Sequence, residues 1–129
     1  MDYKETMDYI HNRSRFNSGK GLDRIKKLLK ELGNPQLSLK CIHIAGTNGK
    51  GSITAMISSI LIAQGYKVGM YTSPYLEEFE ERIQINGKNI PKERLCQVMT
   101  KVSEAEKLID PMNLDTPTEF EIITAAMFL

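Results

Sequence analysis

Apolar residues recur with the three-and-four spacing of an amphipathic helix in several stretches of the chain. We expect a short helix over residues 4–13, a second over 21–32 and a third over 52–64. Gly33 and Pro35 follow the second segment, and glycine followed by proline is a usual signal of a helix C-terminus. The apolar stripes of the two longer segments consist of Leu22, Ile25, Leu28, Leu29 and Leu32, and of Ile53, Met56, Ile57, Ile60 and Leu61.

Two further helices are expected in the second half of the chain. Pro91 opens the first of them, and its buried stripe consists of Leu95, Val98, Met99, Val102 and Ala105. Thr116 and Glu119 have the spacing of a capping box, with Pro117 at the first helical position, and they begin the second. That helix runs into the apolar end 127–129, which indicates the N-terminal part of a longer protein.

Short apolar runs predict β-strands between these helices. Residues 39–46 (LKCIHIAG) indicate a buried strand and residues 67–73 (KVGMYTS) a second one. Strand, glycine-rich loop, helix and strand make a βαβ unit, whose two strands lie parallel through a right-handed crossover. Asn86-Gly87 lies between alternating residues and predicts a hairpin over residues 82–90. The expected fold class is α/β: a P-loop-type parallel sheet with flanking helices and a small β-hairpin, truncated in this sequence.

The amino-acid composition is that of a globular protein. The 129 residues are 41% hydrophobic and 26% charged, with a net charge of +1, as in an ordinary soluble domain. Such a balance provides no basic field for nucleic acid, and the sequence has neither a membrane-span pattern nor a signal-peptide pattern. Cys41 and Cys96 lie on separate segments, which favours reduced thiols. We expect a monomeric cytoplasmic protein without nucleic-acid or membrane partners.

The segment HIAGTNGKGS, residues 43–52, is the strongest candidate for chemistry. Glycines between a strand and a helix let backbone amides approach an anion, and a lysine adds a positive charge. The usual phosphate-loop pattern requires glycine at position 44 and a hydroxyl at position 51, where this chain has Ile44 and Gly51. The predicted ATP-binding residues are Gly46, Thr47, Asn48, Gly49, Lys50, Gly51 and Ser52, with Lys50 also catalytic.

The sequence disfavours two other interpretations of this loop. A dinucleotide site would require G-x-G-x-x-G and an acidic residue at the end of the second strand, and the sequence has neither. A purely structural glycine turn is disfavoured by the strand expected before the loop and the helix expected after it.

Five motifs, taken in order, resemble one family. They are RFNSGKGLDRIKKLLKELGNPQ, HIAGTNGKGS, YTSPYL, ERIQING and PTEFE. The order and the variant loop AGTNGKGS are similar to those of folylpolyglutamate synthases and dihydrofolate synthases, members of the Mur ligase superfamily. The resemblance covers residues 13–129 and implies the N-terminal portion of a longer ATP-binding domain, followed in the family by further metal ligands and a C-terminal domain.

The resemblance implies an activity as well as a fold. Enzymes of this family use ATP and Mg²⁺ to join L-glutamate to a folate or to dihydropteroate through an acyl phosphate. The sequence does not indicate whether the protein catalyses one of these two reactions, the other, or both. A nucleotide- or phosphate-binding module without ligase activity is the alternative.

The resemblance also implies that Ser73 supplies an oxygen ligand to Mg²⁺. The physical argument agrees, because Gly51 has removed the hydroxyl that ordinarily follows the lysine. The alternative is that Ser73 and Pro74 only form a turn after a strand.

The family's pterin-contacting segment matches Thr118, Glu119, Phe120 and Glu121. A carboxylate there could accept two N–H groups of a pterin, and Phe120 could pack on its flat ring. Helix capping by Glu119 and core packing of Phe120 explain the same residues equally well, and spacing does not choose between Glu119 and Glu121.

Charged residues between the second strand and the hairpin remain. Arg82 is expected either to contact an anionic group of the substrate or to form a surface ion pair. The acidic run Glu77, Glu78, Glu80 and Glu81 is expected to be a solvated loop face.

Overall fold

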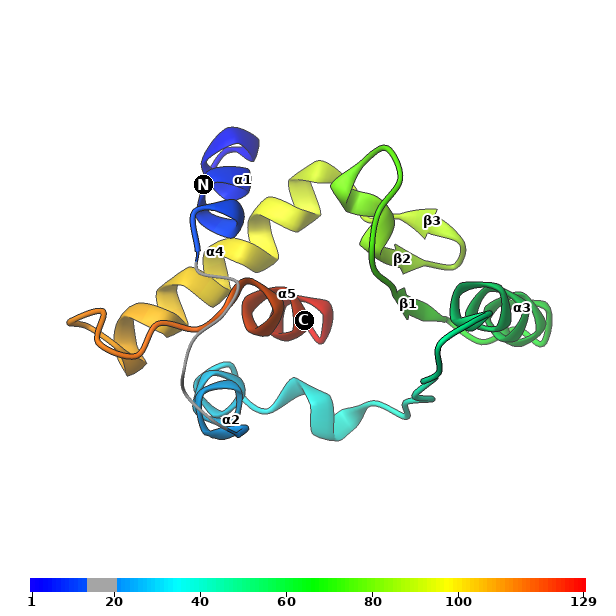
Figure 1. Cartoon of the computed structure of the whole chain (residues 1–129), viewed down its shortest axis with the longest axis horizontal. Coiled ribbons are helices and arrows are strands. Elements are labelled where there is room, and N and C mark those ends of the chain that lie inside the picture. The colour runs from blue at the N-terminus through cyan, green and yellow to red at the C-terminus, as the bar shows by residue number, and fades with distance from the viewer. Residues whose placement is uncertain (14–20) are drawn as a thin grey trace. The chain divides into compact units, whose positions relative to one another are not determined.

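The structure, a computed structural model, describes residues 1–13 and 21–129 (Figure 1). The chain forms two compact units. One combines Met1–Leu39 with Lys92–Leu129, and the other is Lys40–Pro91. We call them the helical unit and the loop unit, respectively.

The helical unit is built around one long helix. α4 (Lys92–Ile109) packs against α1 (Tyr3–His11), α2 (Asp23–Glu31) and α5 (Glu119–Met127). A short 3₁₀ turn, η1 (Pro35–Ser38), follows α2. The predicted stripe of α4 is confirmed, since all five of its residues are buried. The rest of the apolar core of this unit consists of Ile10, Leu28, Leu29, Ile122, Ile123, Ala125 and Ala126.

Capping boxes begin two of these helices. Asp2 and Glu5 form one at α1, and Thr118 and Glu121 form the other at α5. The predicted box of Thr116 and Glu119 is therefore wrong by two residues. The sequence holds both T-x-x-E frames, and spacing alone does not choose between them. Thr116 instead donates a hydrogen bond to the Asp110 carboxylate, with an O···O distance of 3.5 Å.

The loop unit contains one helix and a small sheet. Its elements are α3 (Lys50–Ala63), β1 (Gly69–Tyr71), the 3₁₀ turn η2 (Phe79–Arg82), β2 (Ile83–Ile85) and β3 (Lys88–Asn89). The strands form an antiparallel sheet in the order β1-β2-β3, with Met70 opposite Gln84 and Gln84 opposite Asn89. The predicted hairpin is confirmed: Asn86 and Gly87 have φ of 51° and 79°, as its two-residue turn requires.

The predicted buried strand at residues 39–46 is not formed. The segment has no strand structure, and Ile42 is 63% exposed. The parallel pairing expected with residues 67–73 is therefore also absent, since β1 pairs antiparallel with β2. A strand exists only where another strand pairs with its backbone groups, and within the described residues nothing pairs with 39–46. The observed class is a mixed helical fold with a small antiparallel sheet.

The helix after the glycine loop is confirmed, but its expected burial is not. α3 packs against β1, yet Ile53, Met56 and Ile60 are 48%, 63% and 62% exposed. Among the described residues, no helix has both the length and the apolar character needed to span a bilayer. Cys41 and Cys96 are both free thiols, as expected.

Candidate functional site

The glycine loop forms the start of α3. Gly46 has φ of 149° and Gly49 has φ of 77°, a conformation that residues with a side chain rarely adopt. Gly49 is the N-cap, Lys50 is the first helical residue, and no side chain of the described residues caps the helix. The amide groups of the first turn are thus available to an anion, and the helix dipole favours negative charge there. All seven predicted ATP-binding residues, 46–52, are exposed.

Local packing does not explain why position 51 is a glycine. A Cβ atom at Gly51 would meet no atom within 4 Å. The local structure therefore has room for the hydroxyl residue that ordinary phosphate loops place after the lysine.

Ser73 follows β1 and lies in the same unit as the loop. The residue is exposed, and within the described residues its hydroxyl has no hydrogen-bond partner. No group of three or more His, Cys, Asp or Glu side chains in residues 1–13 and 21–129 could hold a metal ion. A single serine oxygen still fits Mg²⁺, which usually keeps several waters and takes further oxygens from substrate phosphates.

Arg82 is buried in the loop unit, with 9% of the residue exposed. Its Nε donates to the Thr72 carbonyl at 3.3 Å, and its Nη2 donates to the Tyr71 hydroxyl at 3.4 Å. The guanidinium also lies 5.7 and 5.6 Å from the ring centroids of Tyr71 and Phe79. The surface ion pair suggested for Arg82 is therefore wrong, while its contact with substrate remains a prediction.

The acidic run is only partly a solvated face. Glu77 and Glu78 are exposed, but Glu80 is 3% exposed, and its carboxylate oxygens have no hydrogen-bond partner among the residues described. Glu81 accepts hydrogen bonds from the backbone amides of Leu76, Glu77 and Glu78 at 3.1, 2.9 and 2.7 Å. These bonds, that from Glu78 first, lower the pKa of the Glu81 carboxyl below its ordinary value of 4.5. Charge runs along a sequence do not reveal such contacts.

The segment matched to the pterin site divides into two kinds of residue. Thr118 and Glu121 cap α5, and the Glu121 carboxylate also accepts from Arg24 Nη2 at 2.8 Å. This bond is the main cause that raises the pKa of Arg24. Glu119 lies outside the capping box, with its Oε1 3.7 Å from His11 Nδ1.

Phe120 is 61% exposed, so its core interpretation is wrong. Its contact with a flat pterin ring remains a prediction.

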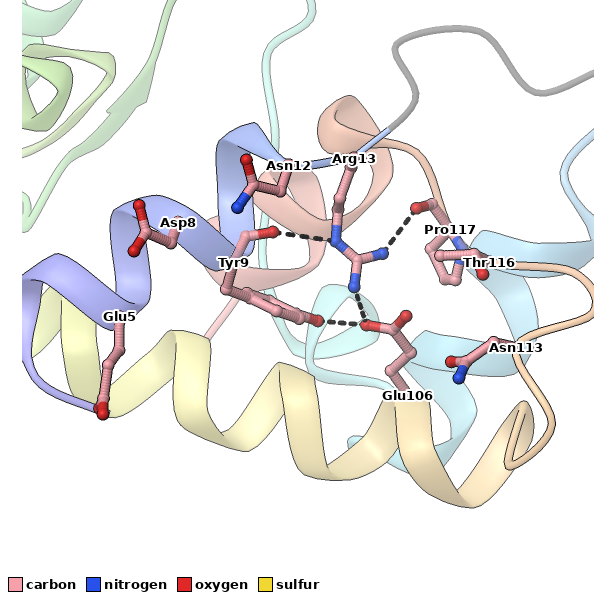
Figure 2. Close-up of a pocket in the computed structure, with 9 residues that line it drawn as sticks. All are labelled: Glu5, Asp8, Tyr9, Asn12, Arg13, Glu106, Asn113, Thr116 and Pro117. Atoms are coloured by element: carbon pink, nitrogen blue, oxygen red, sulfur yellow. Dashed lines mark hydrogen bonds and ion pairs between the residues drawn. The ribbon is translucent and has the colours of Figure 1, made fainter.

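A polar pocket of about 720 Å³ lies in the helical unit, and sequence reasoning missed it (Figure 2). Tyr9 and Arg13 Nη2 both donate to Glu106 Oε2 at its wall. Arg13 Nη1 donates to the Pro117 carbonyl at 2.7 Å, and the guanidinium lies 4.3 Å from the centroid of the Tyr9 ring. Burial, and then the bond to Glu106, raise the pKa of the Tyr9 phenol. The sequence did contain one indication of this network. Glu106 lies four residues after Val102, which places a carboxylate on the buried stripe of α4.

Comparisons with known proteins give the family. No family model matches the chain. The dihydrofolate synthase/folylpolyglutamate synthase of Bacillus subtilis is 42% identical over 127 residues, which cover 98% of this chain and 30% of that protein. The folylpolyglutamate synthase of Lacticaseibacillus casei is 43% identical over 126 residues, covering 97% and 29%. The chain belongs to the folylpolyglutamate synthase/dihydrofolate synthase family.

Solved structures agree with the predicted resemblance. The apo form of L. casei folylpolyglutamate synthase superposes with a TM-score of 0.93 at 41% identity, covering 99% of this chain and 32% of that chain. A folylpolyglutamate synthase complex with AMPPCP and folate gives the same TM-score and the same coverage. The chain thus spans less than a third of the length of these relatives.

Proposed function

We propose that this chain carries the phosphate-binding part of an ATP-dependent ligase that joins L-glutamate to a folate or to dihydropteroate. The main support for this proposal is the N-terminus of α3, which has no side-chain cap among the described residues. Gly46 and Gly49 leave backbone amides available there, and Lys50 adds a positive charge beside them. Relatives at about 40% identity are named as such synthases, which argues against a binding module without ligase activity.

The proposed reaction has two steps. The γ-phosphoryl group of ATP passes to the folate carboxylate, which gives an acyl phosphate and ADP, and the glutamate amine then displaces phosphate. Lys50 and the loop amides hold the β- and γ-phosphates and offset their negative charge as it shifts to the leaving group. Bound Mg²⁺ would supply further charge neutralisation between the two phosphates.

Ser73 is the proposed protein ligand of this Mg²⁺. Its exposed hydroxyl, which has no hydrogen-bond partner among the described residues, and the missing side chain at Gly51 support this assignment. The pterin is proposed to lie against Phe120 and Glu119, since Thr118 and Glu121 already serve the helix cap. Arg82 remains a proposed contact for an anionic group of the substrate.

The complete domain is proposed to contain the parallel sheet that these residues do not form by themselves. The apolar composition of residues 39–46 and the exposed side chains Ile53, Met56 and Ile60 of α3 support a strand and a helix that pack together there.

Calorimetric titration with AMPPCP tests the metal assignment. Ser73→Ala should raise the Mg²⁺ concentration needed for half-maximal nucleotide binding by roughly tenfold, because the metal loses its protein oxygen. Ser52→Ala serves as the matched control and should change this concentration little. Gly51→Ser in the Ser73→Ala background should restore part of the loss, since position 51 has room for the side chain. A larger effect of Ser52→Ala would mean that Ser52 is the metal ligand.

The 129-residue chain alone is expected to have no ligase activity. Acyl-phosphate chemistry requires nucleotide, metal and both substrates in a site sheltered from water, and this chain is less than a third of its relatives' length. The measurement is ADP release with a folate present, with and without glutamate. Glutamate-dependent release would contradict the expectation. A pterin-dependent rise in melting temperature would distinguish the ligase from a simple phosphate binder.

A further inference from the structure

The loop that carries Ser73 is fixed from both sides by one short turn. We call residues 71–78 the Ser73 segment; it begins at the last residue of β1 and ends where η2 starts. Ser73 and Pro74 at its centre are exposed. An exposed loop of this length would ordinarily sample many conformations, since each ordered residue loses backbone entropy. The contacts made by η2 oppose that freedom.

Arg82 holds the first half of the segment. The Thr72 amide donates to the Arg82 carbonyl at 2.9 Å, and Arg82 Nε donates back to the Thr72 carbonyl at 3.3 Å. Both backbone groups of Thr72, the residue before Ser73, are therefore bound to one residue. The same guanidinium reaches the Tyr71 hydroxyl and lies near the rings of Tyr71 and Phe79.

Glu81 and Phe79 hold the second half. The Glu81 carboxylate accepts three consecutive amides, those of Leu76, Glu77 and Glu78. Charge-assisted bonds of this kind are the stronger ones, and they lower the pKa of the Glu81 carboxyl below its ordinary value. Phe79 is buried, and its ring meets the Tyr75 ring edge-to-face with centroids 5.8 Å apart.

We propose that Glu81 and Arg82 are positioning residues that hold the Ser73 segment in one conformation, so that the Ser73 hydroxyl is presented to the metal. The proposal rests on the function proposed above, and it gives Arg82 a role that requires no contact with substrate. The two residues bind the segment on both sides of Ser73, and within residues 1–13 and 21–129 no group bonds the Ser73 hydroxyl, which is the arrangement a preorganised ligand requires.

Two substitutions separate the hold on the segment from general stability. Glu81→Gln keeps the shape of the side chain but replaces the carboxylate with a weaker acceptor. Arg82→Lys keeps the charge but loses the planar fork that serves Thr72 and Tyr71 together. Glu77→Gln is the matched control, because it removes the same charge from an exposed side chain of the same loop.

The first measurement is amide hydrogen exchange by NMR on the 129-residue chain. Glu81→Gln should speed exchange at residues 76–78 by about tenfold, and Arg82→Lys should do the same at Thr72. Amides of α3 should keep their rates in both variants, and Glu77→Gln should change none of them. Unchanged exchange at residues 72 and 76–78 would overturn the proposal.

The second measurement is the Mg²⁺ dependence of AMPPCP binding by calorimetry. Both variants should raise the half-maximal Mg²⁺ concentration several-fold and leave metal-free binding unchanged. Each effect should vanish in a Ser73→Ala background, because residues that act through Ser73 have nothing left to position. If instead Glu81→Gln or Arg82→Lys raised the half-maximal Mg²⁺ concentration by the same factor in the Ser73→Ala background as in wild type, the positioning role would be overturned. The proposed function would not be affected by that result. Wild-type chain that binds no nucleotide would overturn the proposed function and the metal role, while the exchange rates would still decide whether the turn holds the segment.

Discussion

Replacing Lys50 with alanine is expected to weaken nucleotide binding by at least about 100-fold, because its ammonium group is proposed to contact two phosphates and each charge-assisted bond is worth about 1.5–3 kcal/mol. Lys50 is exposed, and the described residues contain no ion pair with it. The Lys50 side chain therefore has no ion pair to lose in the part of the chain that the structure describes, and stability should change by less than about 0.5 kcal/mol. Calorimetry with AMPPCP in Mg²⁺ buffer measures the first effect, and thermal denaturation measures the second.

A matched variant distinguishes this site from general electrostatics. Lys67 is also exposed and lies in the same unit, but outside the glycine loop. Lys67→Ala removes the same charge and should leave nucleotide affinity within about twofold, since Lys67 follows the C-terminal end of α3 whereas the glycine loop precedes its N-terminal end. Equal affinity in Lys50→Ala and wild type would refute the phosphate-loop assignment.

Removing the Glu106 carboxylate is expected to destabilise the helical unit by about 3–5 kcal/mol, because the loss of one partner leaves a buried charge without compensation. Glu106 and Arg13 have side chains only 7% and 9% exposed, and Glu106 also accepts the hydrogen bond of Tyr9. Small domains have only about 5–15 kcal/mol of total stability, so Glu106→Ala should bring this unit close to unfolding. Denaturant unfolding followed by circular dichroism measures the loss.

Replacing the whole network should cost far less than breaking it. Tyr9→Phe, Arg13→Met and Glu106→Leu together remove both buried charges and the Tyr9 hydroxyl, although the Pro117 carbonyl loses its Arg13 donor. Apolar replacements of similar volume for a buried ion pair are often neutral or stabilising. Glu104→Gln, on an exposed position of the same helix, is the control and should change stability by less than about 0.5 kcal/mol. A triple variant less stable than Glu106→Ala would show that the network contributes more than charge compensation.

The helical unit was predictable because its helices bury their stripes against one another. Leu95 to Ala105 on α4 meet residues of α1, α2 and α5, so the apolar pattern and the observed burial coincide. The stripe of α3 and residues 39–46 have equally clear patterns, but no segment of the described chain covers Ile42, Met56 or Ile60. An apolar pattern predicts which face of a helix or strand is buried. It does not predict which other segment of the protein packs against that face.

The candidate site shows the same division between local and distant causes. The start of α3 depends on neighbouring residues, and the sequence predicted it to within two residues of Lys50. The roles of Glu81, Arg82 and Glu106 depend on partners brought together by folding, and a run of charges looks solvated whatever its members later contact. The frame of the α5 capping box was ambiguous because two threonines stand two residues apart.

The order in which a ribosome releases this chain does not match the order in which the helical unit is assembled. α1 and α2, each of nine residues, emerge first, and helices of that length are marginal in water without a packing partner. Their main partner, α4, is synthesised only after the whole of residues 40–91. At ordinary elongation rates Leu28 and Leu29 therefore stay uncovered for seconds, while β1, β2 and β3 are free to pair as soon as they leave the exit tunnel. The nascent chain should accordingly expose the apolar stripe of α2 to chaperones until α4 has been synthesised.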